Sequence, residues 1–209
     1  MMKEHSRAGI GGAWGDELAP TAQRMVAAAR VVLAREGLAG LTVEAVAGEA
    51  GEYRDAVRYH FGGKAGLIAA VVDSLAHDQS LESFTETQAM PPGPQRIHAL
   101  IEGDRRLTGD VPTFQDFFAI LPLVMRDSEL RTRVAALYEW YRDLYVRCFS
   151  DDEDDPRRDA FRRHASLMVA VIDGLAIQKA LDPDGCDLTS LFDLWEAMLH
   201  DSLARVPGG

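Results

Sequence analysis

The chain has 209 residues, a hydrophobic content of 47% and a formal net charge of −11. This length allows one large domain or two small ones, and the apolar content is enough to build a core. The N-terminus lacks a signal-peptide pattern and the longest apolar run is much shorter than a membrane span, which argues against a membrane partner and predicts a cytoplasmic protein.

The first predicted helix follows an N-terminal arm. Residues 1–20 mix glycine with scattered charge, so we expect a flexible arm that ends beside Thr21, a suitable helix cap. Residues 22–36 then carry apolar side chains at helical spacing, and Gly37 is expected to end that helix.

Residues 41–67 have the pattern of a helix-turn-helix. Thr42 stands where a helix N-cap belongs, and apolar residues recur after it at helical spacing until Gly51. A second short helix follows, with Val57 placed to fill the corner between the two, before Lys64 opens another helix. Two short helices that cross steeply need a small residue at their contact and a left-handed turn residue between them. This pattern predicts binding to double-stranded DNA.

The same segment resembles the DNA-binding domain of the tetracycline-repressor (TetR) family. The resemblance rests on an Ala-Gly pair, an aromatic ending, a glycine-lysine step and a leucine. In this sequence they are Ala50-Gly51, Tyr59-His60-Phe61, Gly63-Lys64 and Leu67. The resemblance implies a helix-turn-helix DNA-binding domain over residues 21–67, a ligand-binding and dimerisation domain over residues 68–209, and a homodimer that regulates transcription.

The third helix of this head, near residues 52–61, is expected to lie in the major groove. The predicted DNA-binding residues are Thr42, Tyr53, Arg54, Arg58, Tyr59, His60 and Lys64. Arg54 and Arg58 are candidates for base or phosphate contacts, whereas Thr42, Tyr59, His60 and Lys64 match positions at which the family holds the DNA backbone. Phe61 is more simply a packing residue.

The head carries charges of both signs. Residues 21–67 contain six basic and five acidic residues, so the head is +1 and the rest of the chain is −12. A weakly basic head on an acidic body predicts weak, salt-sensitive non-specific DNA binding. Glu52 and Asp55 depart from the family pattern: they could repel phosphate or accept a hydrogen bond from cytosine, and Glu52 could instead cap the third helix.

The remaining sequence predicts helices only. A helix from Lys64 leaves the head, and the segment Met90–Pro94 ends it. Further helices are expected near residues 95–107, 113–126, 128–150, 156–181 and 188–205. No alternating strand pattern is present, so the predicted fold is all-α with about nine helices.

The acidic run 151–155 could be taken for a cation site, but acids beside a helix start are more simply a solvated loop.

An apolar cluster surrounds Pro122, in the segment 113–127. A proline inside a helix leaves free carbonyls and a gap in packing, so this segment could line a cavity with residues from later helices. The candidate ligand-binding residues are Phe114, Phe117, Phe118, Leu121, Met125, Trp140, Tyr141, Tyr145, His164 and Met168. Aromatic stripes are also typical of plain core. The resemblance implies some cavity, and this lining favours an apolar or aromatic effector.

The last two predicted helices carry more apolar surface than one internal contact needs. The candidate dimerisation residues are Met168, Ile172, Leu175, Leu191, Phe192, Trp195, Met198 and Leu199. The resemblance implies that both helices pair with their copies in a second subunit to form a four-helix bundle. A buried core of a monomer is the alternative.

These expectations combine into a ligand-responsive regulator, most simply a repressor that binds a near-palindromic operator as a homodimer and is released by a small molecule. An alternative is a helical interaction protein that has kept the fold and lost operator binding. An enzyme is not expected, because no Ser/His/Asp, Cys/His, Glu-x-x-His or phosphate-loop pattern is present. No metal or cofactor is expected either, and Cys148 and Cys186 should be buried reduced thiols.

Overall fold

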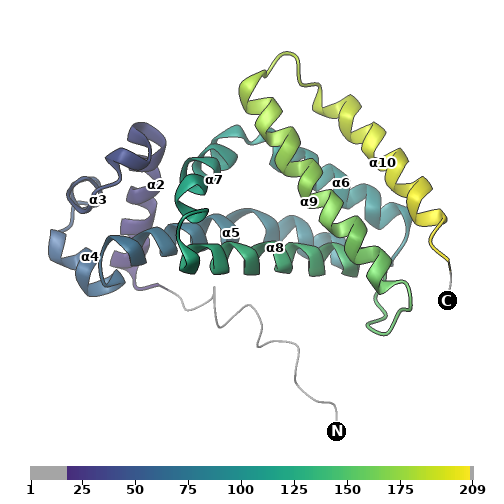
Figure 1. The fold of residues 1–209 in the computed structure, drawn as a ribbon, viewed down its shortest axis with the longest axis horizontal. Helices are drawn as coiled ribbons and strands as arrows, with labels where there is room; N and C mark the ends of the chain where they lie inside the picture. Colours follow the sequence, from purple (N-terminus) through teal and green to yellow (C-terminus); the bar gives the residue numbers. More distant parts are fainter. Residues whose placement is uncertain (1–17, 208–209) are drawn as a thin grey trace, which may run out of the picture. The chain divides into compact units, whose positions relative to one another are not determined.

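A computed structural model describes residues 18–207, except for the side chains of residues 75–86 and Thr113. The described part contains nine helices and no strand, which confirms the predicted all-α fold (Figure 1). The helices are α2 (Pro20–Gly40), α3 (Val43–Ala50), α4 (Arg54–Phe61), α5 (Lys64–Gln88), α6 (Pro94–Gly109), α7 (Val111–Val124), α8 (Ser128–Phe149), α9 (Arg158–Leu181) and α10 (Leu188–Ala204). Most of the predicted arm, residues 1–20, lies outside the described residues.

The chain divides into two compact units. The N-terminal unit comprises the chain up to Asp78 together with Gln115–Val134, and the C-terminal unit comprises Gln79–Phe114 together with the chain from Ala135. Helices α5, α7 and α8 each contribute to both units. The N-terminal unit is therefore larger than the predicted head, residues 21–67, because parts of α7 and α8 cluster with it.

Local signals shape the helix-turn-helix as predicted. Thr42 is the N-cap of α3, and its side-chain oxygen accepts a hydrogen bond from the Ala45 N–H at 3.1 Å. Gly51 follows α3 in the left-handed region at φ 66°, which a residue without Cβ adopts at low cost. Gly62 ends α4 in the same way. Gly37 kinks α2 at φ 67° instead of ending it, so that helix is one turn longer than predicted.

A small core holds the three helices of the head together. Helix α2 packs against both α3 and α4, and α3 packs against α4. Met25 and Val32 of α2, Val46 of α3 and Val57 of α4 are completely buried. Burial of a side chain of this size contributes about 1.5 to 3 kcal/mol. This core fixes the angle between α3 and α4, with Val57 in the predicted corner position.

Two ion pairs connect helices within the N-terminal unit. Arg30 of α2 lies 3.7 Å from Asp116 of α7, and Arg133 of α8 lies 2.9 Å from Asp73 of α5. Burial raises the pKa of both carboxyls, and the arginines oppose that rise. Because loss of one partner would leave a partly buried charge uncompensated, these pairs hold α7 to α2 and α8 to α5.

In the C-terminal unit, α9 and α10 form an antiparallel hairpin and α6 packs against both (Figure 1). Asp187 caps α10, its carboxylate accepting hydrogen bonds from the N–H groups of Thr189 and Ser190.

The acidic run 151–155 before α9 forms a turn. Its last member, Asp155, accepts hydrogen bonds from the backbone and guanidinium of Arg157, which hold the pKa of that carboxyl well below its usual range.

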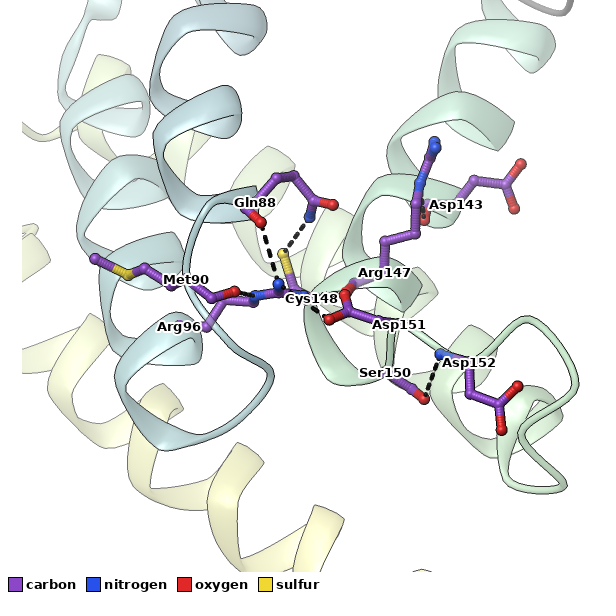
Figure 2. A network of polar contacts seen from close by, with 9 residues as sticks. All are labelled: Gln88, Met90, Arg96, Asp143, Arg147, Cys148, Ser150, Asp151 and Asp152. Atoms are coloured by element: carbon purple, nitrogen blue, oxygen red, sulfur yellow. Dashed lines mark hydrogen bonds and ion pairs between the residues drawn. The ribbon is translucent and has the colours of Figure 1, made fainter. Parts of the chain in front are cut away.

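Arg96 joins the ends of two helices in this unit (Figure 2). Its guanidinium is 2% exposed and donates hydrogen bonds to the carbonyls of Gln88, Met90 and Arg147 and to the carboxylate of Asp151. Gln88 ends α5 and Arg147 lies in the last turn of α8, where helix carbonyls lack partners and carry the negative end of the helix dipole. A planar cation with five N–H donors suits this position.

Helix α9 is long and apolar enough to cross a membrane by length and composition alone. The core helix of a soluble protein passes the same test. Its inner side includes the buried Met168 and Leu175, and its outer side carries Leu167, Ile177 and Leu181 in exposed positions. Helix α9 is therefore a helix with two apolar sides, of which one lacks a partner within the described residues.

Candidate functional site

The exposed side of α4 forms the candidate DNA surface. Arg54, Asp55, Arg58 and Tyr59 are exposed, at spacings that place them on one side of the helix. Tyr59, and Tyr53 just before the helix, expose 84% and 85% of their surface. Each tyrosine combines an apolar ring with a hydroxyl that can reach phosphates or base edges.

The remaining predicted DNA-binding residues also lie in the N-terminal unit. Thr42 is exposed at the start of α3, and Lys64 is exposed at the start of α5, where a helix N-terminus favours an anion such as phosphate. His60 is half-buried, and its ring meets that of Tyr59 edge-on with the centroids 4.9 Å apart. The structure thus brings the predicted set together on α3, α4 and the start of α5.

Acidic side chains occupy the same surface. Glu44, in the first turn of α3, forms an ion pair with Arg54, and Glu52 forms one with Arg24 of α2. Tyr53 takes the N-cap position of α4 without a side-chain hydrogen bond. The alternative that Glu52 caps this helix is therefore wrong, because its carboxylate is engaged with Arg24 instead.

An open hollow of about 730 Å³ lies between α3 and α4. Its lining residues are Val43, Glu44, Tyr53, Arg54, Asp55, Val57, Arg58, Gly62 and Gly63. Two arginines and two carboxylates face this hollow, so its net attraction for phosphate is small. The same groups supply donors and acceptors of the kind that read base edges in the major groove.

The predicted effector-binding residues are divided between the two units. Phe114, Trp140, Tyr141, Tyr145, His164 and Met168 belong to the C-terminal unit, and Phe117, Phe118, Leu121 and Met125 belong to the N-terminal unit. Tyr145 and Met168 are buried, and the half-buried rings of Trp140 and Tyr141 meet edge-on at 5.0 Å. Pro122 lies inside α7, as predicted.

Two members of the predicted effector set have other surroundings. Met125 follows the last residue of α7 and is 64% exposed, so it lines no enclosed cavity. The ring nitrogens of His164 lie 2.8 Å from the Ala160 carbonyl and 2.8 Å from the Ser202 hydroxyl oxygen. Because both nitrogens are occupied by protein groups, His164 connects α9 to α10 and leaves no ring nitrogen for an effector. We correct the predicted set by removing both residues.

A buried carboxyl group outside the set of residues predicted from the sequence lies in the C-terminal unit. Asp104 of α6 is 7% exposed, and its Oδ1 accepts a hydrogen bond from the Tyr145 hydroxyl at 3.0 Å. Its Oδ2 is buried without a hydrogen-bond partner among the described residues. Burial raises the pKa of Asp104 to about 8, against the opposing effect of the Tyr145 hydrogen bond. A bound cation would restore the charge of this carboxyl and complete its contacts.

A second carboxyl, that of Asp173, lies beside α8, the helix that carries Tyr145. The Tyr138 hydroxyl donates a hydrogen bond to Asp173 of α9 at 2.7 Å, and burial raises the pKa of both groups. Tyr138, Tyr141 and Tyr145 recur at helical spacing on one side of α8. Carboxylates and aromatic rings are the groups with which proteins bind small organic cations. No cluster suited to a metal ion occurs within residues 18–207.

The sequence did contain one signal for Asp104. Its neighbours on α6 form an apolar stripe of Ile97, Leu100 and Ile101, and Thr108 is also buried. Asp104 falls on this stripe, three residues after Ile101 and four before Thr108. A charged residue on the apolar face of an amphipathic helix is either paired or functional.

The unpartnered apolar residues of the C-terminal hairpin lie on its outward side. They are Leu167, Ile177 and Leu181 of α9 and Leu194 and Met198 of α10. Of the predicted dimerisation residues, Met198 is exposed, and Leu191 and Trp195 are half-buried beside it. These residues are available to a partner.

The other predicted dimerisation residues need correction. Met168, Ile172, Leu175, Phe192 and Leu199 are buried within the chain. A side chain that is already packed offers little surface to a second subunit. On α9 the stripe that a partner can reach is therefore offset from the predicted one, whereas on α10 it keeps Leu191, Trp195 and Met198 of the predicted set. The sequence pattern could not separate the two apolar sides, because both recur at helical spacing.

Two family models match the sequence. Residues 25–71 match bacterial regulatory proteins of the tetR family, and residues 95–205 match the C-terminal domain of BetI-type transcriptional repressors. The HTH-type transcriptional regulator BetI 2 of Chromohalobacter salexigens is 32% identical over 79% of this chain and 80% of its own length. The regulator BetI of Vibrio atlanticus is 25% identical over 87% of this chain and 89% of its own length.

Solved structures share the fold. A transcriptional regulator from Pseudomonas aeruginosa PAO1 matches with a TM-score of 0.74 and 20% identity, over 87% of this chain and 89% of that chain. A transcriptional regulator from Saccharomonospora viridis, solved in complex with choline, matches with a TM-score of 0.63 and 18% identity, over 88% of this chain and 95% of that chain.

Proposed function

Because this chain belongs to the TetR family of bacterial DNA-binding transcriptional regulators, with a C-terminal domain of the BetI type, we propose that it is a homodimeric repressor that a small organic cation releases from DNA. The buried carboxyl of Asp104, which accepts a hydrogen bond from Tyr145 of α8 and has one oxygen without a partner among the described residues, is the observation that carries this proposal. The sequence alone favoured an apolar or aromatic effector, and the buried carboxyl of Asp104 together with the half-buried one of Asp173 changes that expectation to a cation.

Helix α4 would enter the major groove. Arg54 and Arg58 would face base edges or phosphates, and Thr42 and Lys64 would hold the backbone on either side. A dimer would present two copies of α4 about one DNA turn, ~34 Å, apart, which fits a near-palindromic operator.

The outward side of α9 and α10 would form the dimer contact. Its exposed leucine, isoleucine and methionine side chains make an apolar surface on two neighbouring helices, and a second copy of the hairpin has the matching surface. We expect wild-type protein to show twice the chain mass of 22.9 kDa by light scattering at micromolar concentration. Leu194→Asp should give monomers, because it places a charge in the contact. A monomeric wild type would contradict this contact.

The effector would bind beside α8. An ionised Asp104 without a cationic partner is unfavourable in a buried environment, and a quaternary ammonium group would neutralise it without demanding hydrogen bonds. The rings of Tyr141 and Tyr145 would contact the methyl groups through cation–π attraction. Choline is a suitable probe, since a structural relative was solved with it.

Helix α8 would carry the signal to the head. It bears the tyrosines and, nearer its N-terminal end, Arg133, which pairs with Asp73 of α5. Helix α5 begins at Lys64, shortly after the end of α4, the proposed recognition helix. A cation that changes the packing of α8 would shift α5 and with it the spacing of the two recognition helices, which the operator would then reject. A coupling of about 1 to 3 kcal/mol is enough for a useful response.

The test is a choline titration into protein bound to a labelled duplex from the promoter beside its own gene, followed by fluorescence anisotropy. We expect wild type to bind this duplex and choline to release it. Asp104→Asn should bind the duplex as wild type does and respond weakly to choline. Asp143→Asn, the same change at a more exposed carboxyl of α8, should respond normally.

The outcomes separate the parts of the proposal. Binding of the duplex with no response to choline would overturn the effector assignment. Equal release by 3,3-dimethyl-1-butanol, the uncharged analogue of choline, would overturn the role of charge. Failure to bind the promoter duplex would favour the interaction protein that has kept the fold and lost operator binding.

A further inference from the structure

The ion pair between Glu44 and Arg54 lies on the surface that faces DNA. We propose that Glu44 is a specificity-determining residue. By pairing with Arg54 it lowers the affinity of the head for DNA phosphate in general. Arg54 then contacts DNA only at sites where a base edge can replace the carboxylate of Glu44. This proposal rests on the proposed use of α4 as the recognition helix.

Ion pairs between neighbouring segments neutralise much of the positive charge of the head. They join Arg24 to Glu52, Arg35 to Glu49, and Arg54 to Glu44. Within residues 18–207, Arg58 and Lys64 take part in no such pair. Positive charge that is free to contact phosphate is therefore concentrated at Arg58 and Lys64. For this reason we expect the head, despite its six basic residues, to bind DNA weakly where no operator is present.

The Glu44–Arg54 pair differs from the other two by its position. Both of its side chains line the hollow between α3 and α4, together with Arg58. Arg24 and Arg35 belong to α2 and do not line this hollow. A DNA strand that approaches the N-terminal part of α4 meets the carboxylate of Glu44 together with the guanidinium of Arg54.

The pair is open to exchange. The side chains of Arg54 and Glu44 are 70% and 57% exposed, so water and salt screen their attraction and the pair stabilises the fold little. A phosphate that takes Arg54 from Glu44 gains one ion pair, loses another and brings its own charge close to the carboxylate. The exchange is therefore unfavourable at an arbitrary position on DNA.

A guanine changes this balance. Its O6 and N7 atoms are two neutral acceptors that match the guanidinium in a bidentate contact, and they carry no full charge for Glu44 to repel. Arg54 can then leave Glu44 at a correct base pair more readily than at a phosphate. A group that penalises the wrong partner contributes to specificity as much as one that attracts the right partner.

A simpler role for Glu44 is also testable. An acidic residue in the first turn of a helix interacts favourably with the helix dipole, and Glu44 occupies that position in α3. If this were its only role, its removal would slightly lower thermal stability and leave DNA selectivity unchanged.

The experiment compares Glu44→Gln with Glu49→Gln. Both changes remove one carboxylate from α3 and one ion pair with an arginine, so they alter the net charge equally. Binding is measured by anisotropy on the promoter duplex and on a scrambled duplex of equal composition, over a range of salt concentrations. We expect Glu44→Gln to tighten binding to the scrambled duplex about two- to fivefold per subunit. We also expect its salt dependence to steepen by about one unit per subunit, with a smaller change for Glu49→Gln.

A double-mutant cycle shows whether Glu44 acts through Arg54. In an Arg54→Ala background, the tightening caused by Glu44→Gln should fall to less than half of its value in wild type. Equal tightening in both backgrounds, or equal effects of the Glu44 and Glu49 substitutions, would overturn the proposal, because net charge alone would then explain the result. An unchanged ratio of promoter to scrambled affinity in Glu44→Gln would overturn it as well.

Arg58→Ala separates this inference from the proposed function. If Arg58→Ala weakens promoter binding while Glu44→Gln changes nothing, only the role of Glu44 fails. If Arg58→Ala and Lys64→Ala both leave promoter binding intact, α4 is not the recognition helix and both proposals fail together.

Discussion

The ion pairs on the surface of the head and two buried ionisable groups of the C-terminal unit lie in opposite environments. In the head, Arg24, Arg35 and Arg54 pair with carboxylates at positions that water reaches. In the C-terminal unit, Arg96 and Asp104 are almost completely buried. Exposed pairs are weak and exchange partners easily, whereas buried polar groups are costly unless every contact is made. The arginines of the head can therefore exchange their carboxylate partners for groups on DNA. The C-terminal unit, in contrast, is suited to hold a fixed arrangement that one missing contact can perturb.

The buried groups themselves differ. Arg96 has a partner for each of its three nitrogen atoms, which makes it a structural connection between helix ends. Asp104 has one satisfied oxygen and one without a partner among the described residues. We infer that the first group stabilises the unit and that the second gives it a response to a ligand.

The largest effect in this comparison should come from Arg96→Ala. The substitution removes a buried cation that bonds the carbonyls of Gln88, Met90 and Arg147 and the carboxylate of Asp151, and each hydrogen bond to a charged group contributes about 1.5 to 3 kcal/mol. We expect a loss of about 3 to 5 kcal/mol in the free energy of unfolding, measured with urea at fixed protein concentration. A loss below about 1 kcal/mol would show that water replaces the guanidinium.

A pH effect should follow from Asp104. Its pKa of about 8 in the folded chain lies above the unfolded value near 4. The folded state therefore holds a proton that the unfolded state has lost, and stability present below pH 4 declines as the pH rises toward 8. The slope contributed by one proton is about 1.4 kcal/mol per pH unit. Asp104→Asn should remove most of this decline between pH 5 and 7, and identical slopes in both proteins would contradict the assigned pKa.

An intermediate effect is expected for Arg58→Ala. Loss of a guanidinium that reads a guanine should weaken promoter binding by about 1 to 3 kcal/mol and relax the preference at one position in each half-site. Lys64→Ala, in contrast, should weaken promoter and scrambled duplexes alike, since a lysine at a helix start contacts phosphate. Selection from a random duplex pool, combined with salt titration, distinguishes the two. An unchanged selected sequence in Arg58→Ala would remove it from the base contacts.

The smallest effect should come from the exposed pairs of the head. Arg35→Gln should leave the unfolding midpoint almost unchanged, because the guanidinium lies in water beside Glu36 and Glu49. The measurement is thermal unfolding beside Arg96→Ala under the same conditions. A midpoint drop comparable to that of Arg96→Ala would break the contrast between the two units.

Local signals account for what the sequence predicted well. Thr42 and Gly51 act through their own backbone neighbourhood, so their roles as cap and left-handed turn were predictable without tertiary information. The helical apolar spacing likewise indicated every helix of the described chain. Gly37 was misjudged, because a left-handed glycine can kink a helix as well as end it.

Tertiary placement accounts for what the sequence did not predict. The roles of Arg96 and Asp104 depend on groups 41 to 55 residues away along the chain, which no local pattern reveals. The two apolar sides of α9 share one periodicity, so only packing separates the buried Met168 from the exposed Leu167. The pairing of Glu44 with Arg54 required the angle between α3 and α4.

The central claim is that an ionised Asp104 binds a small organic cation in the C-terminal unit. Its most direct test is calorimetric titration of wild type with choline at several pH values, beside Asp104→Asn. Choline keeps its charge at every pH, so only the protein can change. We predict that affinity rises about tenfold per pH unit below pH 8, levels off above it, and loses this dependence in Asp104→Asn. Choline binding that is independent of pH, or equally tight in Asp104→Asn, would contradict the account.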